Sequence, residues 1–184
     1  MPRRKQAKKP HGPKPTPPPI GCLALGLDVS SRAAGLALVR RGERGPVVLD
    51  LRLVRPPSSW DAFRRIDHLA DTVQDFVVGL DEQINLVVLE WTDGAAWLAR
   101  KHAGSWASHV VTLAAAQSAV RRAILPYVDK VETYTSTRWT DRVPKEDRAE
   151  RLRDRYFAYR AWPISRDPGL DVADGLGLAV WRLT

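Results

Sequence analysis

The apolar residues near the start of the chain fall into two runs that a short polar turn separates. The first run covers 22–27 and ends on Asp28, and the second covers 36–39 and follows Gly35. Two short apolar runs joined by a turn of small and polar residues are typical of a β-hairpin. Because the first run is apolar at odd and even positions alike, it predicts a central strand that is covered on both faces.

The rest of the pattern predicts strands that alternate with helices. Ser59 can cap the helix that follows the third strand, and Gly79 ends that helix. Gly175 and Gly177 lower the intrinsic stability of the last helix. Their presence therefore predicts that this helix packs tightly against the sheet. The expected elements are strand 46–54, helix 60–78, strand 84–90, helix 105–125, strand 130–135, the polar and basic segment 136–148, helix 146–160 and helix 170–183.

Two of these helices differ in the face that they are expected to bury. In helix 146–160 the signs of the charges alternate, which predicts a solvated face. Helix 60–78 instead has apolar positions at helical spacing, which predicts a buried stripe. The residues of this stripe are Phe63, Ile66, Leu69, Ala70, Val73, Phe76 and Val77.

Four acidic residues stand where this pattern predicts strand ends or one helical face. Asp28 and Glu90 each follow an apolar strand, and Asp171 and Asp174 are three residues apart near the start of the last helix. A lone buried carboxylate is costly unless a cation or hydrogen-bond donors compensate for it. Because hard divalent cations prefer oxygen ligands, the four acids predict a carboxylate site for such ions.

The positive charge of the chain is concentrated near residue 1. The 184 residues carry a formal charge of +8, and the first nineteen contain six cationic side chains and seven prolines with no acid. Such a segment forms neither a core nor a helix, so we expect 1–20 to be a basic, Pro-rich, disordered tail and 21–184 to be one domain. The tail is either a nonspecific phosphate-binding arm or a solubilising terminus.

Several kinds of protein are excluded by what the sequence lacks. The tail has no apolar signal core, and no stretch approaches the about 18 to 20 apolar residues that span a membrane. We therefore expect no membrane association and a cytoplasmic location, or the host cytoplasm if the chain is viral. Cys22 is the single cysteine, which excludes an intrachain disulfide and a Cys-rich zinc site, and the four histidines show no metal-ligand spacing.

Residues 91–104 are poorly periodic and contain aromatic and basic side chains. Trp91, Trp97, Arg100 and Lys101 follow Glu90 closely. A loop of this composition can stack on unpaired bases and contact phosphates, so we expect it to bind nucleic acid. The alternative is that one or both tryptophans pack on the core.

Three motifs together are similar to those of one known family. They are Gly26-Leu-Asp-Val-Ser-Ser-Arg-Ala-Ala-Gly35 followed by a strand, Val87-Val-Leu-Glu90, and Asp171-Val-Ala-Asp-Gly-Leu-Gly-Leu-Ala179. In their order and spacing they resemble the RuvC-type Holliday junction resolvases of the ribonuclease H-like superfamily, over about 22–184. The resemblance implies an α/β fold with a mixed five-stranded sheet flanked by helices, in which the first three strands are antiparallel.

The resemblance also implies a metal-dependent endodeoxyribonuclease. Asp28, Glu90, Asp171 and Asp174 would hold two Mg²⁺ or Mn²⁺ ions per active site, which activate a water and stabilise charge on the attacking and leaving oxygens. Lys145 lies in the segment where the family uses lysines near the scissile phosphate, and it would stabilise charge in the transition state.

Further nucleic-acid contacts are expected from the basic segment before Lys145. This segment is shorter than in typical bacterial members, and Trp139 stands where a basic residue is expected. Arg138 and Arg142 are the alternative phosphate contacts, and Trp139 is grouped with them as a nucleic-acid-binding residue. Either tryptophan of the loop 91–104 could act as the aromatic wedge of the family.

The resemblance implies a four-way DNA junction as substrate and a homodimer as the active form. Paired nicks in opposing strands require two active sites related by symmetry. Helix 105–125 has small residues in its middle that permit close approach, so we expect it to form much of the dimer interface.

Other functions stay open at this point. A nuclease for flaps, other branched DNA or RNA, including the pre-ribosomal-RNA processing family, could use the same fold. A noncatalytic nucleic-acid-binding module would be expected to lack one or more of the acids, and all four are present. The sugar-kinase, actin and chaperone ATPase superfamily has a similar hairpin but needs two such domains, and this chain has no repeated hairpin.

Overall fold

A computed structural model describes residues 13–92, 105–141, 143–157, 167 and 169–184. These residues form a five-stranded sheet with the strand order β3-β2-β1-β4-β5. The pairs β1–β2 and β2–β3 are antiparallel, whereas β1–β4 and β4–β5 are parallel, which confirms the predicted mixed sheet. The strands are β1 (Leu23–Val29), β2 (Ala34–Gly42), β3 (Gly45–Val54), β4 (Leu86–Glu90) and β5 (Val131–Tyr134).

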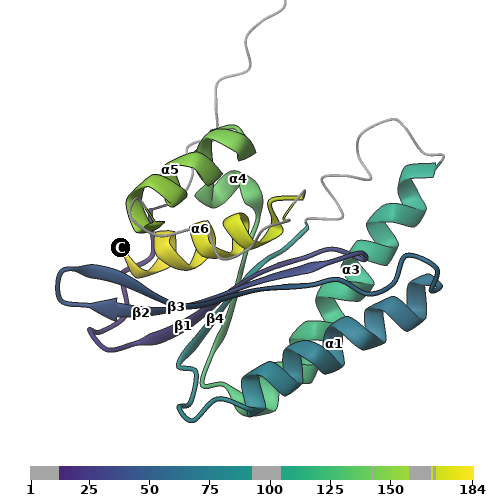
Figure 1. Ribbon diagram of the computed structural model, residues 1–184, viewed down its shortest axis with the longest axis horizontal. Coiled ribbons are helices and arrows are strands. Elements are labelled where there is room, and N and C mark those ends of the chain that lie inside the picture. Colours follow the sequence, from purple (N-terminus) through teal and green to yellow (C-terminus); the bar gives the residue numbers. More distant parts are fainter. Residues whose placement is uncertain (1–12, 93–104, 142, 158–166, 168) are drawn as a thin grey trace, which may run out of the picture.

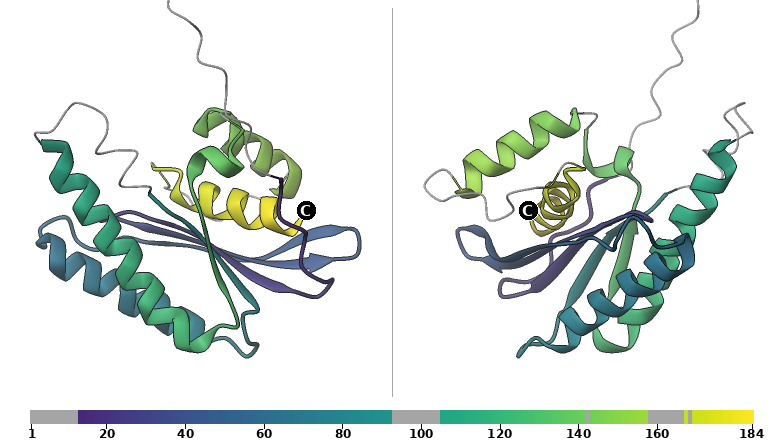
Figure 2. Two further views of the ribbon diagram at one scale, coloured as in Figure 1. Left: turned by 180° about the vertical axis from the view of Figure 1, so that it is seen from behind. Right: turned by 45° about the vertical axis from the view of Figure 1, so that its right-hand side comes forward.

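Helices cover both faces of the sheet (Figures 1 and 2). One face carries α1 and α3, which pack on each other, and the other face carries α6 with α4 and α5 above it. None of the helices in the described ranges has the length and apolar character that crossing a membrane requires. The helices are α1 (Ala62–Val78), α3 (Ser105–Ile124), α4 (Ser136–Trp139), α5 (Lys145–Phe157) and α6 (Asp171–Leu183), with a 3₁₀ turn, η1 (Leu125–Tyr127), after α3.

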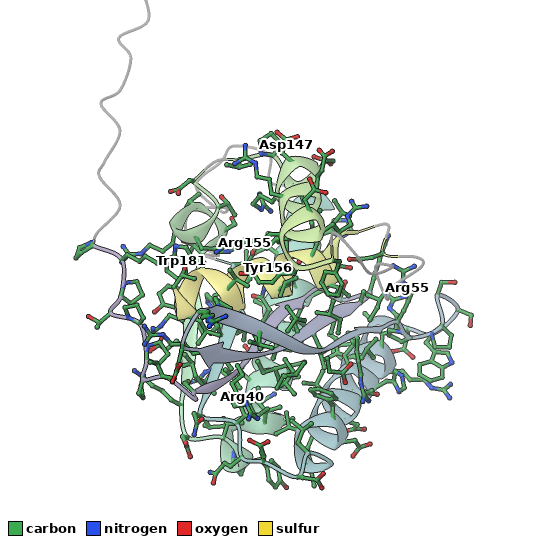
Figure 3. The ribbon with its side chains drawn as sticks, turned by 60° about the vertical axis from the view of Figure 1, so that its left-hand side comes forward. Arg40, Arg55, Asp147, Arg155, Tyr156 and Trp181 are labelled. Carbon is green, nitrogen blue, oxygen red and sulfur yellow. The ribbon has the colours of Figure 1, made fainter. Side chains whose placement is uncertain are left out.

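The two helical layers explain why β1 is apolar on both faces. Leu25 and its neighbours at alternate positions belong to the core beneath α1 and α3, and Ala24 belongs to the core beneath α6. Figure 3 shows the same division at the periphery, with Tyr156 and Trp181 on the α5–α6 side of the sheet and Arg40 on the opposite side. Because β1 lies in the middle of the sheet, neither of its faces meets water.

The start of α1 differs from the predicted helix 60–78. The helix begins at Ala62, and its cap is Asp61, whose Oδ1 accepts a hydrogen bond of 2.9 Å from the Arg64 backbone nitrogen. Ser59 was therefore the wrong cap. Phe63 was wrongly assigned to the buried stripe: it is 80% exposed because it lies in the first turn, before the buried stripe begins at Ile66.

Other boundaries move by a few residues. Strand pairing in β4 starts at Leu86, although Ile84 forms an isolated bridge with Val128. The polar and basic segment 136–148 contains the short helix α4, and α5 begins at Lys145, one residue before the predicted helix 146–160. Gly177 packs against the Trp139 ring and not against the sheet. The prediction that this glycine allows close approach to the sheet was therefore wrong.

The last eight residues of the predicted tail contact the domain. Residues 13–20, here called the N-terminal strap, contain no helix or strand, but they lie against the domain. Arg182 Nη1 donates to Thr16 O at 2.8 Å, and Arg138 and Arg41 donate to Pro13 O and Pro18 O. Arginine side chains of the domain thus satisfy three carbonyls of the strap.

Candidate active site

Parallel pairing brings two of the predicted acids to the same edge of the sheet. Leu27 on β1 is paired with Leu89 on β4, so the next residues along the two strands are Asp28 and Glu90. Both strands run in the same direction, and their carboxyl ends therefore meet. The side chain of Asp28 is 16% exposed, which makes this edge a partly enclosed site.

Backbone contacts place the start of α6 directly over this edge. A Cβ atom built on Gly35 would collide with the backbone of Asp171, and one built on Gly26 would collide with the carbonyl of Gly175. Only glycine permits such close approach at these two strand positions. Since Gly35 is paired with Asp28, the two acids in the first turn of α6 lie beside Asp28.

A carboxylate that the sequence analysis did not select holds the first turn of α6. Asp167 Oδ1 accepts from the backbone nitrogen of Asp171 at 2.9 Å, and Asp167 Oδ2 accepts from that of Val172 at 3.0 Å. These bonds satisfy amides that have no partner within the helix. Asp167 lies four residues before the first residue of α6, whereas a capping residue is normally expected immediately before the helix.

Lys145, the first residue of α5, extends into the space between three of the acids. Its Nζ lies 2.9 Å from Asp174 Oδ2, 3.5 Å from Asp28 Oδ2 and 3.6 Å from Asp171 Oδ1. The ammonium group is thus the cation on which carboxylates from β1 and α6 converge. The structure brings the predicted set of Asp28, Asp171, Asp174 and Lys145 together, with Glu90 at the same edge.

The charges of these groups are strongly interdependent. Burial raises the pKa of Asp28 well above its usual value, and repulsion from Glu90 raises it further. Burial likewise raises the pKa of Glu90 and that of Asp171. Burial alone would lower the pKa of Lys145, but attraction to Asp28 and Asp174 outweighs it and raises this pKa. The cluster therefore needs positive charge to stay ionised.

Arg148 is a second cation in the site. Its Nη2 donates to Asp174 Oδ1 at 2.7 Å, and its Nη1 donates to the Val143 carbonyl. The side chain of Arg148 is only 16% exposed. The charge pattern of helix 146–160 had predicted a solvated face, and this was wrong at Arg148. The signal for Arg148 is its spacing, because it follows Lys145 by one helical turn and lies on the same face.

Trp139 does not lie where a base could stack on it. Its residue exposure is 6%, its ring packs against Gly177, and its indole Nε1 donates to Glu90 Oε2 at 3.0 Å. Trp139 was therefore wrongly grouped with the nucleic-acid contacts. It fixes the orientation of Glu90, and the guanidinium of Arg148 lies 4.9 Å from the centre of its ring.

Gln117 on α3 supports the two strand ends from the opposite face of the sheet. It is 2% exposed, its Oε1 accepts from the Thr92 backbone nitrogen at 3.1 Å, and its Nε2 donates to Val29 O at 3.4 Å. These bonds join the residues just after Asp28 and Glu90. A polar residue in an Ala-rich helix is the sequence signal that could have identified it.

The remaining predicted contacts have mixed outcomes. Trp91 is partly buried and packs against the core beneath α1 and α3, as the alternative interpretation expected. Arg138 donates to the N-terminal strap at Pro13 O. Four further residues lie outside the described residues: Trp97, Arg100, Lys101 and Arg142.

The donor set fits a divalent cation in its chemistry. Among the described residues, no three His, Cys, Asp or Glu side chains are already arranged around a metal position. Three carboxylates nevertheless converge on the ammonium group of Lys145, which balances their negative charge as a metal ion would. Oxygen ligands from carboxylates are those that Mg²⁺ and Mn²⁺ prefer. The residues therefore fit such ions, with Lys145 as the competing cation.

The sequence matches no family model and no curated protein. The fold, in contrast, resembles solved structures. The T. thermophilus RuvC in complex with Holliday junction substrate is 17% identical, with a TM-score of 0.63, over 87% of this chain and 91% of that chain.

Two further structures give the same result. The Thermus thermophilus RuvC structure is 17% identical with a TM-score of 0.60, and it covers 86% of this chain and 92% of its own. The yeast mitochondrial Holliday junction resolvase Ydc2 is 12% identical with a TM-score of 0.57, over 90% of this chain and 80% of its own. The chain therefore has the ribonuclease H-like fold of the RuvC-type Holliday junction resolvases.

Proposed function

We propose that this protein is a metal-dependent endonuclease that resolves four-way DNA junctions by paired nicks. The observation that carries the proposal is the convergence of Asp28, Asp171 and Asp174 on the ammonium of Lys145. These carboxylates come from β1 and α6, and Glu90 from β4 lies at the same edge of the sheet. A structural role alone would not require so many acids at one strand edge.

Asp28, Glu90, Asp171 and Asp174 would hold the Mg²⁺ or Mn²⁺ ions, two per active site. When bound, such ions activate a water for attack on a phosphodiester and stabilise charge on the attacking and leaving oxygens. Arg148 holds Asp174 Oδ1, which keeps Oδ2 directed into the site. Trp139 holds Glu90 Oε2 in the same way.

Lys145 has a role of its own in this proposal. Its flexible four-carbon stem allows the ammonium to leave the carboxylates and donate to an oxygen of the substrate phosphate. Before substrate binds, the same group balances the negative charge of the cluster. Lys145 therefore contributes to charge stabilisation in the transition state.

The substrate assignment is supported by the fold of a RuvC whose structure contains a Holliday junction. Paired nicks require two active sites, so we propose a homodimer in which α3 forms much of the interface. Light scattering at micromolar concentration measures this directly. A stable monomer would contradict the paired-nick mechanism.

A nuclease assay tests the proposal. Labelled four-way junction, flap, linear duplex and structured RNA are each incubated with Mg²⁺ or Mn²⁺, using the wild type, Asp174→Asn and the matched control Asp147→Asn. Asp147 is an exposed acid on α5, away from the carboxylate cluster (Figure 3). We expect symmetric nicks in the junction for the wild type and the control, and binding without cleavage for Asp174→Asn.

Other outcomes separate the alternatives. Cleavage of flaps or RNA in preference to junctions would keep the metal site but replace the substrate. No cleavage of any substrate would favour a noncatalytic binding module. Full activity of Asp174→Asn in Mg²⁺ would refute its role as a metal ligand.

A further inference from the structure

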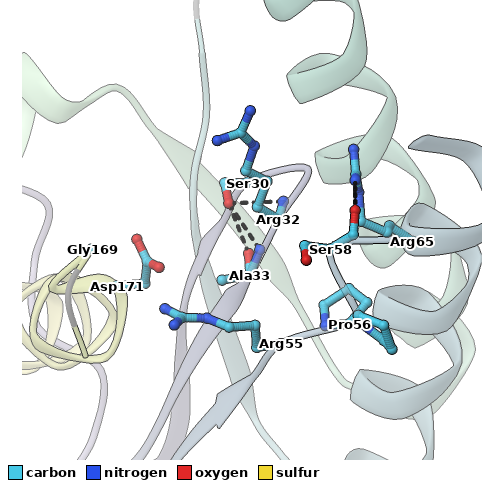
Figure 4. A pocket seen from close by; sticks show the side chains of 10 residues that line it. Ser30, Arg32, Ala33, Arg55, Pro56, Ser58, Arg65, Gly169 and Asp171 are labelled. Atoms are coloured by element: carbon cyan, nitrogen blue, oxygen red, sulfur yellow. Dashed lines mark hydrogen bonds between the residues drawn. The ribbon is translucent and has the colours of Figure 1, made fainter. Parts of the chain in front are cut away.

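A trough opens beside Asp171 and runs away from the carboxylate cluster (Figure 4). It has a volume of about 840 Å³. Its walls are the turn between β1 and β2, the linker between β3 and α1, and the start of α6. The lining residues are Ser30, Arg32, Ala33, Arg55, Pro56, Pro57, Ser58, Arg65, Gly169 and Asp171.

The charge of the trough is positive except at Asp171, where it meets the cluster. Arg32 and Arg55 are exposed, and neither side chain has a hydrogen bond or an ion pair within the described ranges. Other arginines of the same sheet are paired, as Arg40 is with Glu82 and Arg52 with Asp50. Two unpaired guanidinium groups are therefore available to an anion in the trough.

Arg65 has a different role from the other two arginines. Its Nη1 donates to the carbonyls of Ser58 at 3.4 Å and Trp60 at 2.9 Å, which fixes the linker that forms one wall. Figure 4 shows Arg65 directed toward Ser58, whereas Arg55 extends toward Asp171. The residues available to a ligand are thus Arg32 and Arg55.

The elements that carry these two arginines are held in place before any ligand binds. In the turn between β1 and β2, Ser30 Oγ accepts from the backbone nitrogens of Arg32 at 3.2 Å and Ala33 at 3.0 Å. Arg55 is followed by Pro56 and Pro57, whose rings restrict the backbone of the linker. The backbone that carries the two cations therefore loses little conformational freedom on binding.

The lining also indicates which part of a nucleic acid fits. Among the described residues, no aromatic side chain lines the trough, and its apolar surface comes from Ala33 and the two prolines. A base or nucleotide ring would therefore find no stacking partner there. Phosphate groups, in contrast, match free guanidinium groups in charge and hydrogen-bonding geometry.

We propose that the trough holds the phosphodiester backbone of a duplex DNA arm, with Arg32 and Arg55 contacting phosphates on one side of the scissile bond. This inference rests on the proposed function, because Asp171 connects the trough to the carboxylate cluster. A strand that presents one phosphate to the cluster extends its neighbouring phosphates into the trough. The contacts position the strand and do not read its sequence.

The test is a binding measurement that does not depend on cleavage. Anisotropy of labelled four-way junction and of linear duplex is measured in EDTA at several salt concentrations, for the full-length wild type and Arg32→Gln/Arg55→Gln. The matched control is Arg44→Gln, an exposed arginine in the turn between β2 and β3 at the other end of the sheet. Thermal unfolding checks that all three proteins are folded.

We expect the double variant to lower the slope of log affinity against log salt by about 1 for each lost phosphate contact, so by about 2. The Arg44→Gln slope should equal that of the wild type. A double variant with the slope of Arg44→Gln would overturn the proposal.

The binding result and the nuclease result are separable. If the wild type nicks junctions and the double variant keeps the wild-type slope, the nuclease stands and the trough assignment fails. If no substrate is nicked but the slope falls by about 2, the trough stands as a DNA-binding site and the nuclease fails. Failure of the wild type to bind either DNA would overturn both.

Discussion

The indole Nε1 of Trp139 donates a hydrogen bond of 3.0 Å to Glu90 Oε2, so a buried aromatic residue fixes one of the candidate metal ligands. Trp139→Phe keeps most of the ring but removes this donor. We expect it to lower stability by about 1 to 3 kcal/mol, because a buried acceptor is left without its partner.

Trp139→Phe should also raise the Mg²⁺ concentration that nicking requires. Loss of a group that orients a metal ligand typically costs about 10-fold to 100-fold in metal affinity or activity. The measurement is the nicking rate as a function of Mg²⁺ concentration. Trp181→Phe is the matched control, because Trp181 makes an edge-to-face contact with Tyr134 and no hydrogen bond from it to a site carboxylate is found among the described residues. Equal Mg²⁺ requirements for the two variants would contradict the positioning role.

Removing the ammonium of Lys145 should destabilise the protein in the absence of divalent cations. Lys145→Met leaves three carboxylates facing one another without the ammonium between them. The Lys145 side chain is 32% exposed, so we expect the free energy of unfolding to fall by about 1 to 3 kcal/mol, which is less than for a fully buried pair. Mn²⁺ should then raise the melting temperature of the variant more than that of the wild type.

The control for this comparison is Lys130→Met. Lys130 pairs with Glu132, which is not part of the carboxylate cluster, so loss of Lys130 should leave the Mn²⁺ response equal to that of the wild type. Thermal unfolding in EDTA and in Mn²⁺ gives the difference in melting temperature between each variant and the wild type under both conditions. A smaller Mn²⁺ response in Lys145→Met than in the wild type would show that the ammonium and the metal do not compete for the same carboxylates.

The ion pair between Glu132 and Arg182 should give the protein a defined acid sensitivity. Burial would raise the pKa of Glu132, but hydrogen bonds from Arg182, Lys130 and Tyr134 outweigh it and lower this pKa to about 2. A carboxylate whose pKa is lower in the folded state stabilises that state above its unfolded pKa of 4.5. This contribution, roughly 3 kcal/mol, is lost as the pH falls toward about 2.

Urea unfolding of the wild type and Glu132→Gln at pH 7, 4 and 3 measures the effect, since the first value lies above the window of about 4.5 to 2 in which Glu132 changes charge and the other two lie within it. We expect the wild type to be more stable at neutral pH and the difference to shrink as the pH falls. A difference that is the same at every pH would exclude Glu132 as the titrating group.

The N-terminal strap and the residues before it should have separable roles. Deleting 1–12 removes cationic side chains but keeps the strap, so we expect weaker DNA binding and a flatter salt slope with an unchanged melting temperature. Deleting 1–20 should in addition lower the melting temperature, because Arg182 and Arg138 lose their backbone acceptors. An unchanged salt slope in both deletions would identify 1–12 as a solubilising terminus.

The acids could be predicted from the sequence because each stands in a pattern of its own. Asp28 and Glu90 end apolar strands, and Asp171 and Asp174 share a helical face. Parallel pairing then brings the strand ends together without any special residue. The glycines were also informative, since Gly175 does lie against the backbone of the sheet, as expected.

The groups that orient these acids were harder to predict. Trp139 and Arg148 belong to a polar segment without periodicity, and their burial follows only from the way α4 and α5 fold back over α6. Gln117 depends in the same way on the docking of α3. Tertiary contacts of this kind leave only weak signals in the sequence, such as the spacing of Arg148 from Lys145, whereas strand ends and helical faces leave clear ones.

The direct contact between the backbones of β1 and α6 has a consequence for synthesis of the protein. Among the strands of the described sheet, the one that ends near Asp28 is translated first, and Asp174 belongs to a helix that is translated after all of them. The carboxylate cluster therefore cannot assemble on a nascent chain until α6 has emerged. A partly translated chain would contain Arg32 and Arg55 without the complete set of acids, so the proposed nuclease activity would require translation to pass α6.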